Sequence, residues 1–179
     1  ATNGYQFGYA LAQEDSSFSL LSKLLSVQKE AAENASLFFL GGYLRSLFEN
    51  DQQAWEALMD TFALETDTSF WVLELAQRAG RVTNKAAKRI LNTIRADELP
   101  ARLFLQFMYG GMLNDLSEEL FTEWIEFLLK KTDPTAVYVA LGLYSMFYTR
   151  NEAKHIPPAD LTVKLLTHEG FAKLPKEFQ

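Results

Sequence analysis

The side chains that most often carry acid–base or metal chemistry are sparse in this sequence. It contains two histidines and no cysteine, which excludes disulfides, thiolate metal sites and thiol nucleophiles. We expect His155 in a polar loop and His168 near the end of a helix, where the helix dipole favours a cationic side chain. Both histidines are therefore interpreted as structural, with a ligand or catalytic role as the alternative.

Acidic side chains offer one more candidate for chemistry. Glu119, Glu123 and Glu126 share one face of a predicted helix, and three carboxylates can bind a divalent cation. A solvated helix face explains the same spacing, and we prefer it. The sequence has no phosphate-binding glycine loop, no His-Glu-x-x-His and no Gly-x-Ser-x-Gly motif. We therefore predict that the protein is not an enzyme and has no cofactor, metal or small-molecule substrate.

The clearest functional signal is a basic segment between Gln77 and Ala96 that contains no acidic residue. On the helix predicted after Thr83, five residues follow one stripe at helical spacing, namely Lys85, Lys88, Arg89, Asn92 and Arg95. Such a stripe can bind an acidic peptide, a phosphopeptide or a nucleic acid. The predicted partner-binding residues are Arg78, Arg81, Lys85, Lys88, Arg89, Asn92 and Arg95.

Two alternatives to a protein-binding stripe remain open. Acidic residues on the flanking helices, namely Glu56, Asp60, Glu119, Glu123 and Glu126, would neutralise the stripe if stacked helices formed ion pairs with it. Nucleic acid is the alternative partner. Against it, the net charge is −6 and the basic residues are confined to one segment. No aromatic residue alternates with them to stack on bases, so we expect a protein or an acidic peptide.

The elements that would position this stripe are all predicted to be helices. Apolar residues recur at helical spacing and no period-2 strand is found, while 48% apolar and 13% aromatic residues can form a substantial core. Asp51, Thr83 and Ser117 suit N-caps, and Gly80 suits a left-handed C-cap. Nine helices are predicted, over about 16–29, 34–48, 52–62, 69–79, 83–94, 100–115, 117–128, 133–148 and 157–167.

These helices follow a repeat. The first helices of successive pairs begin near 34, 68, 100 and 134, an interval typical of helix-turn-helix solenoid repeats. The stretch around Gly41-Gly42 and Trp55 also recurs 69 residues later, around Gly110-Gly111 and Trp124. We interpret both glycine pairs as sites inside helices where a neighbouring helix packs closely, with each Trp filling the space. A ligand that approaches the glycines is the alternative.

This pattern resembles HEAT-like and armadillo-like α-solenoids over most of Ser16 to Glu169. The resemblance implies an all-α α-solenoid of about four antiparallel helix pairs, plus a leading N-terminal helix, in one repeat domain over residues 1–179. An irregular helical bundle is the alternative. In a solenoid the second helix of each pair lines the concave surface, so the resemblance implies a scaffold that binds a protein partner through the basic stripe.

Other features concern location and chain ends. No segment approaches the ~18 apolar residues of a membrane span, and the N-terminus lacks the pattern of a secretory signal. Together with the absence of cysteine, this predicts a cytoplasmic protein that does not enter a membrane. The start at Ala1 and the unplaced Phe171, Leu174 and Phe178 predict a segment of a longer protein, or a domain that docks against another chain. Alternatively, the tail folds back over the end of the stack.

Overall fold

The computed structural model of the chain describes residues 2–31, 35–96, 98–109, 111–131, 133–149 and 155–170. Every regular element in these ranges is a helix and none is a strand, so the predicted all-α class is confirmed. The chain divides into two compact units, which comprise residues 1–80 and 81–179. The predicted tail contacts of Phe171, Leu174 and Phe178 lie outside the described residues.

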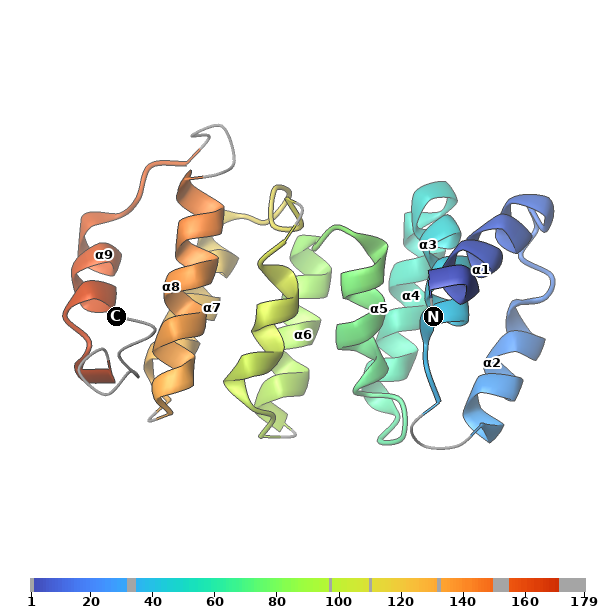
Figure 1. Cartoon of the computed structure of the whole chain (residues 1–179), viewed down its shortest axis with the longest axis horizontal. Helices are drawn as coiled ribbons and strands as arrows, with labels where there is room; N and C mark the ends of the chain where they lie inside the picture. The colour runs from blue at the N-terminus through green and yellow to red at the C-terminus, as the bar shows by residue number, and fades with distance from the viewer. Residues whose placement is uncertain are drawn as a thin grey trace. The chain divides into compact units, whose positions relative to one another are not determined.

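Unit 1 is organised around one buried helix, α3. Its helices are α1 (Thr2–Glu14), α2 (Leu21–Glu30), α3 (Phe38–Asn50), α4 (Gln52–Leu64) and α5 (Trp71–Ala79). α3 contacts each of the other four, and these helices can be followed from blue to green in Figure 1. Because it is surrounded, α3 is apolar on most sides, and Leu40, Tyr43, Leu44 and Leu47 are all buried.

Unit 2 has an aromatic core around α8. Its helices are α6 (Asn84–Ala96), the 3₁₀ helix η1 (Ala101–Phe107), α7 (Glu118–Leu129), α8 (Pro134–Thr149) and α9 (Ala159–Leu166). α8 packs on η1, α7 and α9, while α6 packs on α7. The rings of Phe121 and Phe147 are stacked, with their centroids 4.0 Å apart. Over both units, no helix in the described residues has the length and apolarity needed to cross a bilayer.

Four of the predicted local signals for helix ends are confirmed. Asp51, Thr83 and Ser117 each accept a hydrogen bond from the backbone amide three residues later, at 2.9, 3.0 and 3.4 Å. Gly80 ends α5 in the left-handed conformation, with φ of 73°. These caps satisfy amide groups that have no partner inside the helix, so the boundaries follow from residue type alone.

Near the N-terminus, the sequence-based prediction misses one helix and misplaces the start of another. Residues 2–14, for which no element was predicted, form α1. The helix expected to open at Ser16-Ser17 begins instead at Leu21. Glycines at 4 and 8 lower helix propensity and interrupt the apolar spacing that would have identified α1. Its helical state therefore depends on packing against α3.

The helix predicted over 100–115 is also wrong. The chain forms η1 to Phe107 and then a series of turns, as 3₁₀ geometry seldom continues for long. Gly111 has φ of 69°, which is incompatible with a right-handed helix. It therefore does not belong to a glycine pair inside a helix, and Gly110 lies outside the described residues.

Gly41 and Gly42 do lie inside a helix and do permit close packing, but their neighbour was not predicted. A Cβ on Gly41 would collide with the side chain of Arg78, and one on Gly42 would lie 2.9 Å from the backbone nitrogen of Tyr9 in α1. The prediction that Trp55 fills this space is therefore wrong. The space is taken by α1 and by Arg78.

The two tryptophans of the repeated stretch have different surroundings within their units. Both are fully buried. Trp55 meets the ring of Phe48 edge-on at 5.1 Å, and its indole N–H finds no hydrogen-bond acceptor in the described parts of the chain. Trp124 instead packs on Phe104 at 4.8 Å and donates to the carbonyl of Ala87 at 3.1 Å. The shared sequence thus gives neither a shared environment nor a shared local structure, since Gly42 lies inside α3 whereas Gly111 lies in a turn.

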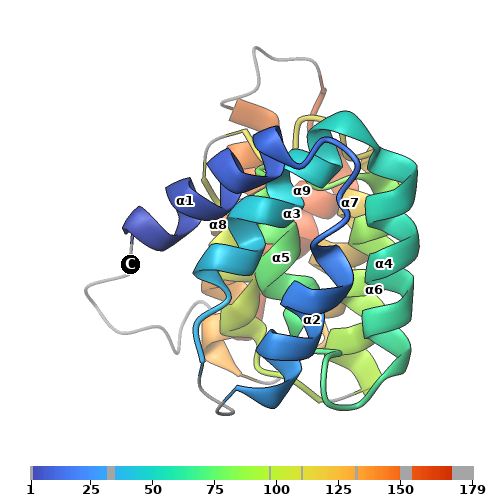
Figure 2. The same ribbon diagram turned by 90° about the vertical axis from the view of Figure 1, so that its right-hand side faces the viewer.

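The crossing of α1 over α3 in unit 1, which Figure 2 shows, is a contact of two helix backbones. It is reciprocal, because each helix contributes a glycine. A Cβ on Gly8 of α1 would collide with the backbone oxygen of Phe39 and lie 3.1 Å from the backbone nitrogen of Tyr43. On the other side of the crossing, Gly42 faces the backbone of Tyr5 and Tyr9. The two backbones therefore touch without intervening side chains.

We predict that Gly8→Ala destabilises the protein by about 1–3 kcal/mol, the usual cost of overpacking, although alanine favours a helix more than glycine does. Gly4→Ala in the same helix is the matched control, since its Cβ would find its nearest neighbour 3.9 Å away. That variant should be neutral or slightly stabilising. Urea unfolding followed by far-UV circular dichroism measures both, and equal effects of the two substitutions would contradict the crossing.

Candidate functional site

The predicted basic stripe lies on the exposed face of α6. Lys85, Lys88, Asn92 and Arg95 are exposed, whereas the opposite face is buried, with Ala86, Ala87, Ile90, Leu91 and Ile94 in the core. The helical period separates the two sets. Unit 2 therefore presents four of the seven predicted partner-binding residues on one helix face.

Arg89, in the middle of the same helix, differs from these four. Its side chain is buried, with 6% of its surface exposed. Arg89 and Lys85 each interact with another group of the protein. Arg95 lies with its guanidinium carbon 5.4 Å from the ring centroid of Phe127, a cation–π distance. Lys88 has no hydrogen-bond or ion-pair partner among the residues that the structure describes.

The predicted residues before α6 have other roles. Arg81 belongs to unit 2 and reaches Asp115 at 3.3 Å, with 65% of its side chain exposed. Arg78 belongs to unit 1, where it forms an ion pair with Glu74 and stacks over Phe38 at 3.9 Å. Only 13% of its side chain is exposed, so the contacts inside unit 1 already engage Arg78.

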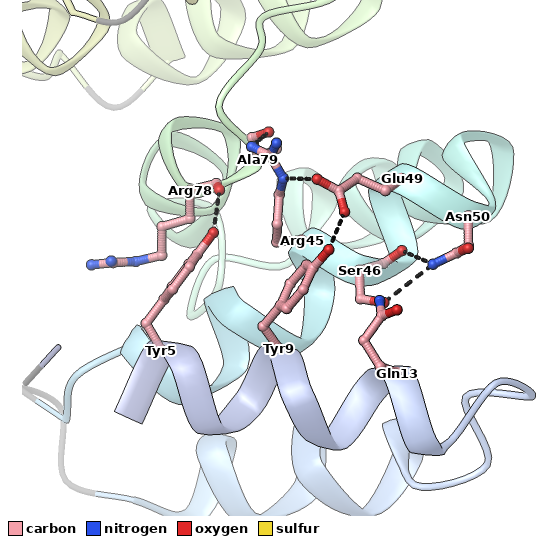
Figure 3. Close-up of polar contacts among 9 residues, drawn as sticks. All are labelled: Tyr5, Tyr9, Gln13, Arg45, Ser46, Glu49, Asn50, Arg78 and Ala79. Carbon is pink, nitrogen blue, oxygen red and sulfur yellow. Dashed lines mark hydrogen bonds and ion pairs between the residues drawn. The ribbon is translucent and has the colours of Figure 1, made fainter. Parts of the chain in front are cut away.

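Arg78 is part of a polar network that fixes α1, drawn in Figure 3. Three side chains of α1, those of Tyr5, Tyr9 and Gln13, point to the same side. Tyr5 donates to the carbonyl of Arg78 at 3.1 Å, and Gln13 donates to Ser46 at 2.7 Å. The network thus secures α1 to both α3 and α5.

Tyr9 is the central member of this network. Its hydroxyl donates to Glu49 at 2.7 Å, and Glu49 also accepts from Arg45 at 2.6 Å. Arg45 in turn donates to the carbonyl of Ala79, at the end of α5. The hydrogen bond to Glu49 raises the pKa of Tyr9 above its usual value. The phenol of Tyr9 therefore stays protonated at neutral pH and continues to donate to Glu49.

The acidic residues of α7 are a predicted source of neutralisation for the basic stripe in unit 2. Glu126 forms an ion pair with Lys164 at 3.2 Å, so its charge is balanced by α9. Glu119 and Glu123 are exposed. No group of three or more metal-ligating side chains gathers in the described ranges, so these carboxylates do not converge on one point there.

Both histidines make structural contacts. His168 accepts from the amide of Gly170 at 3.1 Å through Nδ1, and its Nε2 lies 2.9 Å from the carbonyl of Leu129. Both ring nitrogens are thereby used, and the end of α9 is joined to the end of α7. His155 stacks on Phe147 at 4.5 Å, and its Nδ1 lies 2.6 Å from Glu118.

Tyr148, whose ring packs against that of Phe147 at 5.0 Å, has a raised pKa. Burial, followed by the charges of Glu118 and Tyr144, raises its pKa to about 12. Its hydroxyl is buried without a hydrogen-bond partner in the described residues. A phenol held in its neutral form is poorly matched to proton abstraction at neutral pH, so this cluster gives little support to acid–base catalysis.

Each unit also has an open pocket. The pocket in unit 2, of about 560 Å³, lies between α7 and α9 near Glu126 and Lys164, whose charges balance each other. The pocket in unit 1, of about 600 Å³, lies between the end of α2 and the turn from α4 to α5. Sequence reasoning missed this second pocket. Its only signal is the polar turn at 65–69 followed by Phe70 and Trp71.

The helix α2 that borders the unit 1 pocket is held mainly by polar contacts at its two ends, as it has no buried residue. At its start, Asp15 accepts from Tyr43 at 2.5 Å and from the amide of Leu20 at 2.9 Å. At its end, Lys29 pairs with Glu65 at 2.5 Å. The hydrogen bond from Tyr43, followed by that from Leu20, holds the pKa of the Asp15 carboxyl well below its usual range.

Comparison with known proteins identifies no relative from which a function could be inferred. The sequence matches no family model, and neither curated proteins nor solved structures gave a match.

We predict that Tyr43→Phe makes the protein's stability less sensitive to acid. Because the folded-state pKa of Asp15 is lowered, its contribution is present above the unfolded pKa of about 4 and is lost as the pH falls toward the folded-state pKa. The variant lacks the main cause of the lowered pKa. The difference in free energy of unfolding between wild type and variant should therefore shrink between about pH 6 and about pH 2.5.

Urea unfolding at the two pH values measures this difference. Tyr5→Phe is the matched control, since Tyr5 donates to a backbone carbonyl that does not titrate. Its difference from wild type should stay constant over the same range. A Tyr43→Phe difference that is equally independent of pH would contradict the assignment.

Proposed function

We propose that the protein is a non-catalytic interaction module that binds an acidic protein segment through the exposed face of α6. The observation that carries the proposal is this face itself. It presents Lys88, Asn92 and Arg95 to solvent, with no acidic residue on the helix. Lys85 is also exposed, one turn before Lys88, and Arg81, which pairs with Asp115, lies just before the helix. Arg78 and Arg89, which are engaged or buried within the fold, are left out of the surface.

The charge of the two units supports this assignment. Residues 1–80 contain four basic and eleven acidic side chains, a formal charge of −7, whereas residues 81–179 contain thirteen and twelve, a formal charge of +1. An acidic ligand is therefore repelled by unit 1 and tolerated by unit 2. Within unit 2, the α6 face is where basic side chains are concentrated.

The architecture proposed for this module is a HEAT-like or armadillo-like stack of helix pairs, in which α6 is the second helix of its pair. Support comes from the repeat interval and from the helix-turn-helix order, which the helix boundaries follow except at α1 and η1. In such a stack α6 would line the concave surface, so that a bound segment would lie across several repeats.

Nucleic acid is the second candidate, because the same basic face would attract phosphates. Two observations favour a protein over it. The stripe has no exposed aromatic side chain among its members, so that bases would find nothing to stack on. The acidic unit 1 would also repel a long polyanion.

We predict that a fluorescein-labelled poly-glutamate peptide binds the protein and that Lys88→Glu with Arg95→Glu weakens the binding by about tenfold or more. Exposed charge pairs contribute up to ~1 kcal/mol each, and reversal converts attraction to repulsion. Fluorescence anisotropy at low salt measures the affinity. Lys23→Glu with Lys164→Glu is the matched control, since it makes the same charge change away from α6, and it should weaken binding much less.

A labelled single-stranded oligonucleotide of equal length separates the two candidates. Tighter binding of the oligonucleotide, with a steep dependence on salt, would favour the nucleic-acid function. Equal losses in the α6 and control variants would show that only the total charge matters and would reject the α6 surface.

We predict that small-angle X-ray scattering gives a radius of gyration clearly above ~16 Å, the value expected for a compact domain of this length. A stack of helix pairs is longer than it is wide, because each added pair displaces the next by roughly 8–10 Å. The pair-distance distribution should accordingly be skewed to long distances. A symmetric pair-distance distribution together with a radius of gyration near ~16 Å would instead favour the irregular bundle.

A further inference from the structure

The pocket of unit 1 joins two aromatic rings to a carboxylate. Its walls come from Gln28 and Lys29 at the end of α2 and from Thr66, Asp67, Phe70 and Trp71 around the turn between α4 and α5. A smaller hollow of about 110 Å³ adjoins it and shares Lys29, Asp67 and Trp71. A volume of about 600 Å³ is within the usual range for small-ligand sites.

The turn that forms this wall is rigidly held. Thr68 is buried, its hydroxyl donates to the carbonyl of Phe62 at 3.1 Å, and its carbonyl accepts from the amide of Trp71 at 2.9 Å. The ring of Trp71 meets the buried Phe62 edge-on at 5.4 Å. Trp71 is thus fixed in position before any ligand arrives, while Phe70 keeps 46% of its surface exposed.

The charges at the pocket do not cancel. Lys29 is paired with Glu65, and the hydrogen bond from Lys29 lowers the pKa of Glu65, which therefore stays ionised. Asp67 is exposed and has no hydrogen-bond or ion-pair partner in the described part of the chain. One uncompensated carboxylate thus lines the same pocket as an indole and a phenyl ring, in a unit whose formal charge is −7.

We propose that this pocket binds an organic cation of the guanidinium or alkylammonium type, held between the Asp67 carboxylate and the Trp71 ring. A cation is attracted to the face of an aromatic ring, and most strongly to tryptophan. The carboxylate supplies the charge-assisted contact. Such a cation is either a free small molecule or the side chain of an arginine or lysine in a peptide.

Other ligand classes fit the pocket less well. An anion would meet Asp67 and the charge of unit 1, and Lys29 is already paired with Glu65. A hard metal ion needs several converging oxygen ligands, and no such group forms in the described ranges. The aromatic walls of the pocket would not contribute to the binding of an anion or of a hard metal ion.

The tryptophans make this proposal directly measurable. Of the three in the sequence, Trp55 and Trp124 are fully buried, with exposures of 0%, so a ligand in the pocket changes chiefly the fluorescence of Trp71. The first probe is N-acetyl-arginine amide, titrated against the intact chain. N-acetyl-citrulline amide is its uncharged match, with the same shape. We expect saturable quenching by the arginine amide and at least about fivefold weaker binding of the citrulline amide.

Variants test which residues hold the cation. Asp67→Asn should weaken binding of the arginine amide by about fivefold or more, while Glu119→Gln, the same charge change on α7 in unit 2, should leave it within about twofold. Trp71→Leu, followed by isothermal titration calorimetry because the reporter is removed, should also weaken it. Far-UV circular dichroism of each variant confirms that the fold is kept.

Two further probes distinguish the source of the cation. Tetramethylammonium alone represents a free cation, and a short arginine-containing peptide represents a protein partner. Preference for the peptide over the arginine amide assigns the pocket to a partner side chain, whereas equal or tighter binding of tetramethylammonium assigns it to a small molecule. Equal binding of the arginine and citrulline amides, or an Asp67→Asn variant that binds like wild type, would overturn the proposal.

Discussion

Unit 1 depends on one steric constraint, the contact of two helix backbones where α1 crosses α3. The contact exists because Gly8 and Gly42 carry no side chain, and a Cβ on either would collide with the opposite backbone. Close approach brings Tyr9 within hydrogen-bonding distance of Glu49 and Tyr5 within reach of the carbonyl of Arg78. The polar network is therefore a consequence of the crossing, since larger residues at the glycines would separate its partners.

The same crossing acts on the pocket through α2. That helix buries none of its residues, so apolar burial contributes little to its position. Asp15, the first residue after α1, fixes the start of α2 by accepting hydrogen bonds from Tyr43 and from the amide of Leu20, and Lys29 fixes its end. Because Tyr43 belongs to α3, the position of one pocket wall is set by how α1 and α3 meet.

The sequence predicts features that depend on local interactions and misses those that depend on distant neighbours. The caps at Asp51, Thr83 and Ser117 involve atoms three residues apart, so residue type alone reveals them. The crossing at Gly8 involves the backbone of α3, and its glycines weaken the pattern by which α1 would be recognised. Likewise, spacing places Lys88 and Arg89 on the same stripe of α6, but tertiary packing alone decides that Lys88 is exposed and Arg89 is buried.

Because charge is divided unequally between the units, the two proposed sites would bind ligands of opposite charge. The α6 surface in unit 2 is proposed to bind anionic groups, and the pocket in unit 1 to bind a cation beside Asp67. Added salt weakens contacts between exposed charges of either sign, so salt alone cannot distinguish the two sites. The aromatic wall can distinguish them, because the attraction of a cation to Trp71 requires a ring face that the α6 stripe lacks. Comparing a cationic ligand with its uncharged isostere therefore tests the pocket alone, while charge reversal on α6 tests the stripe alone. Either proposal can be rejected without affecting the other.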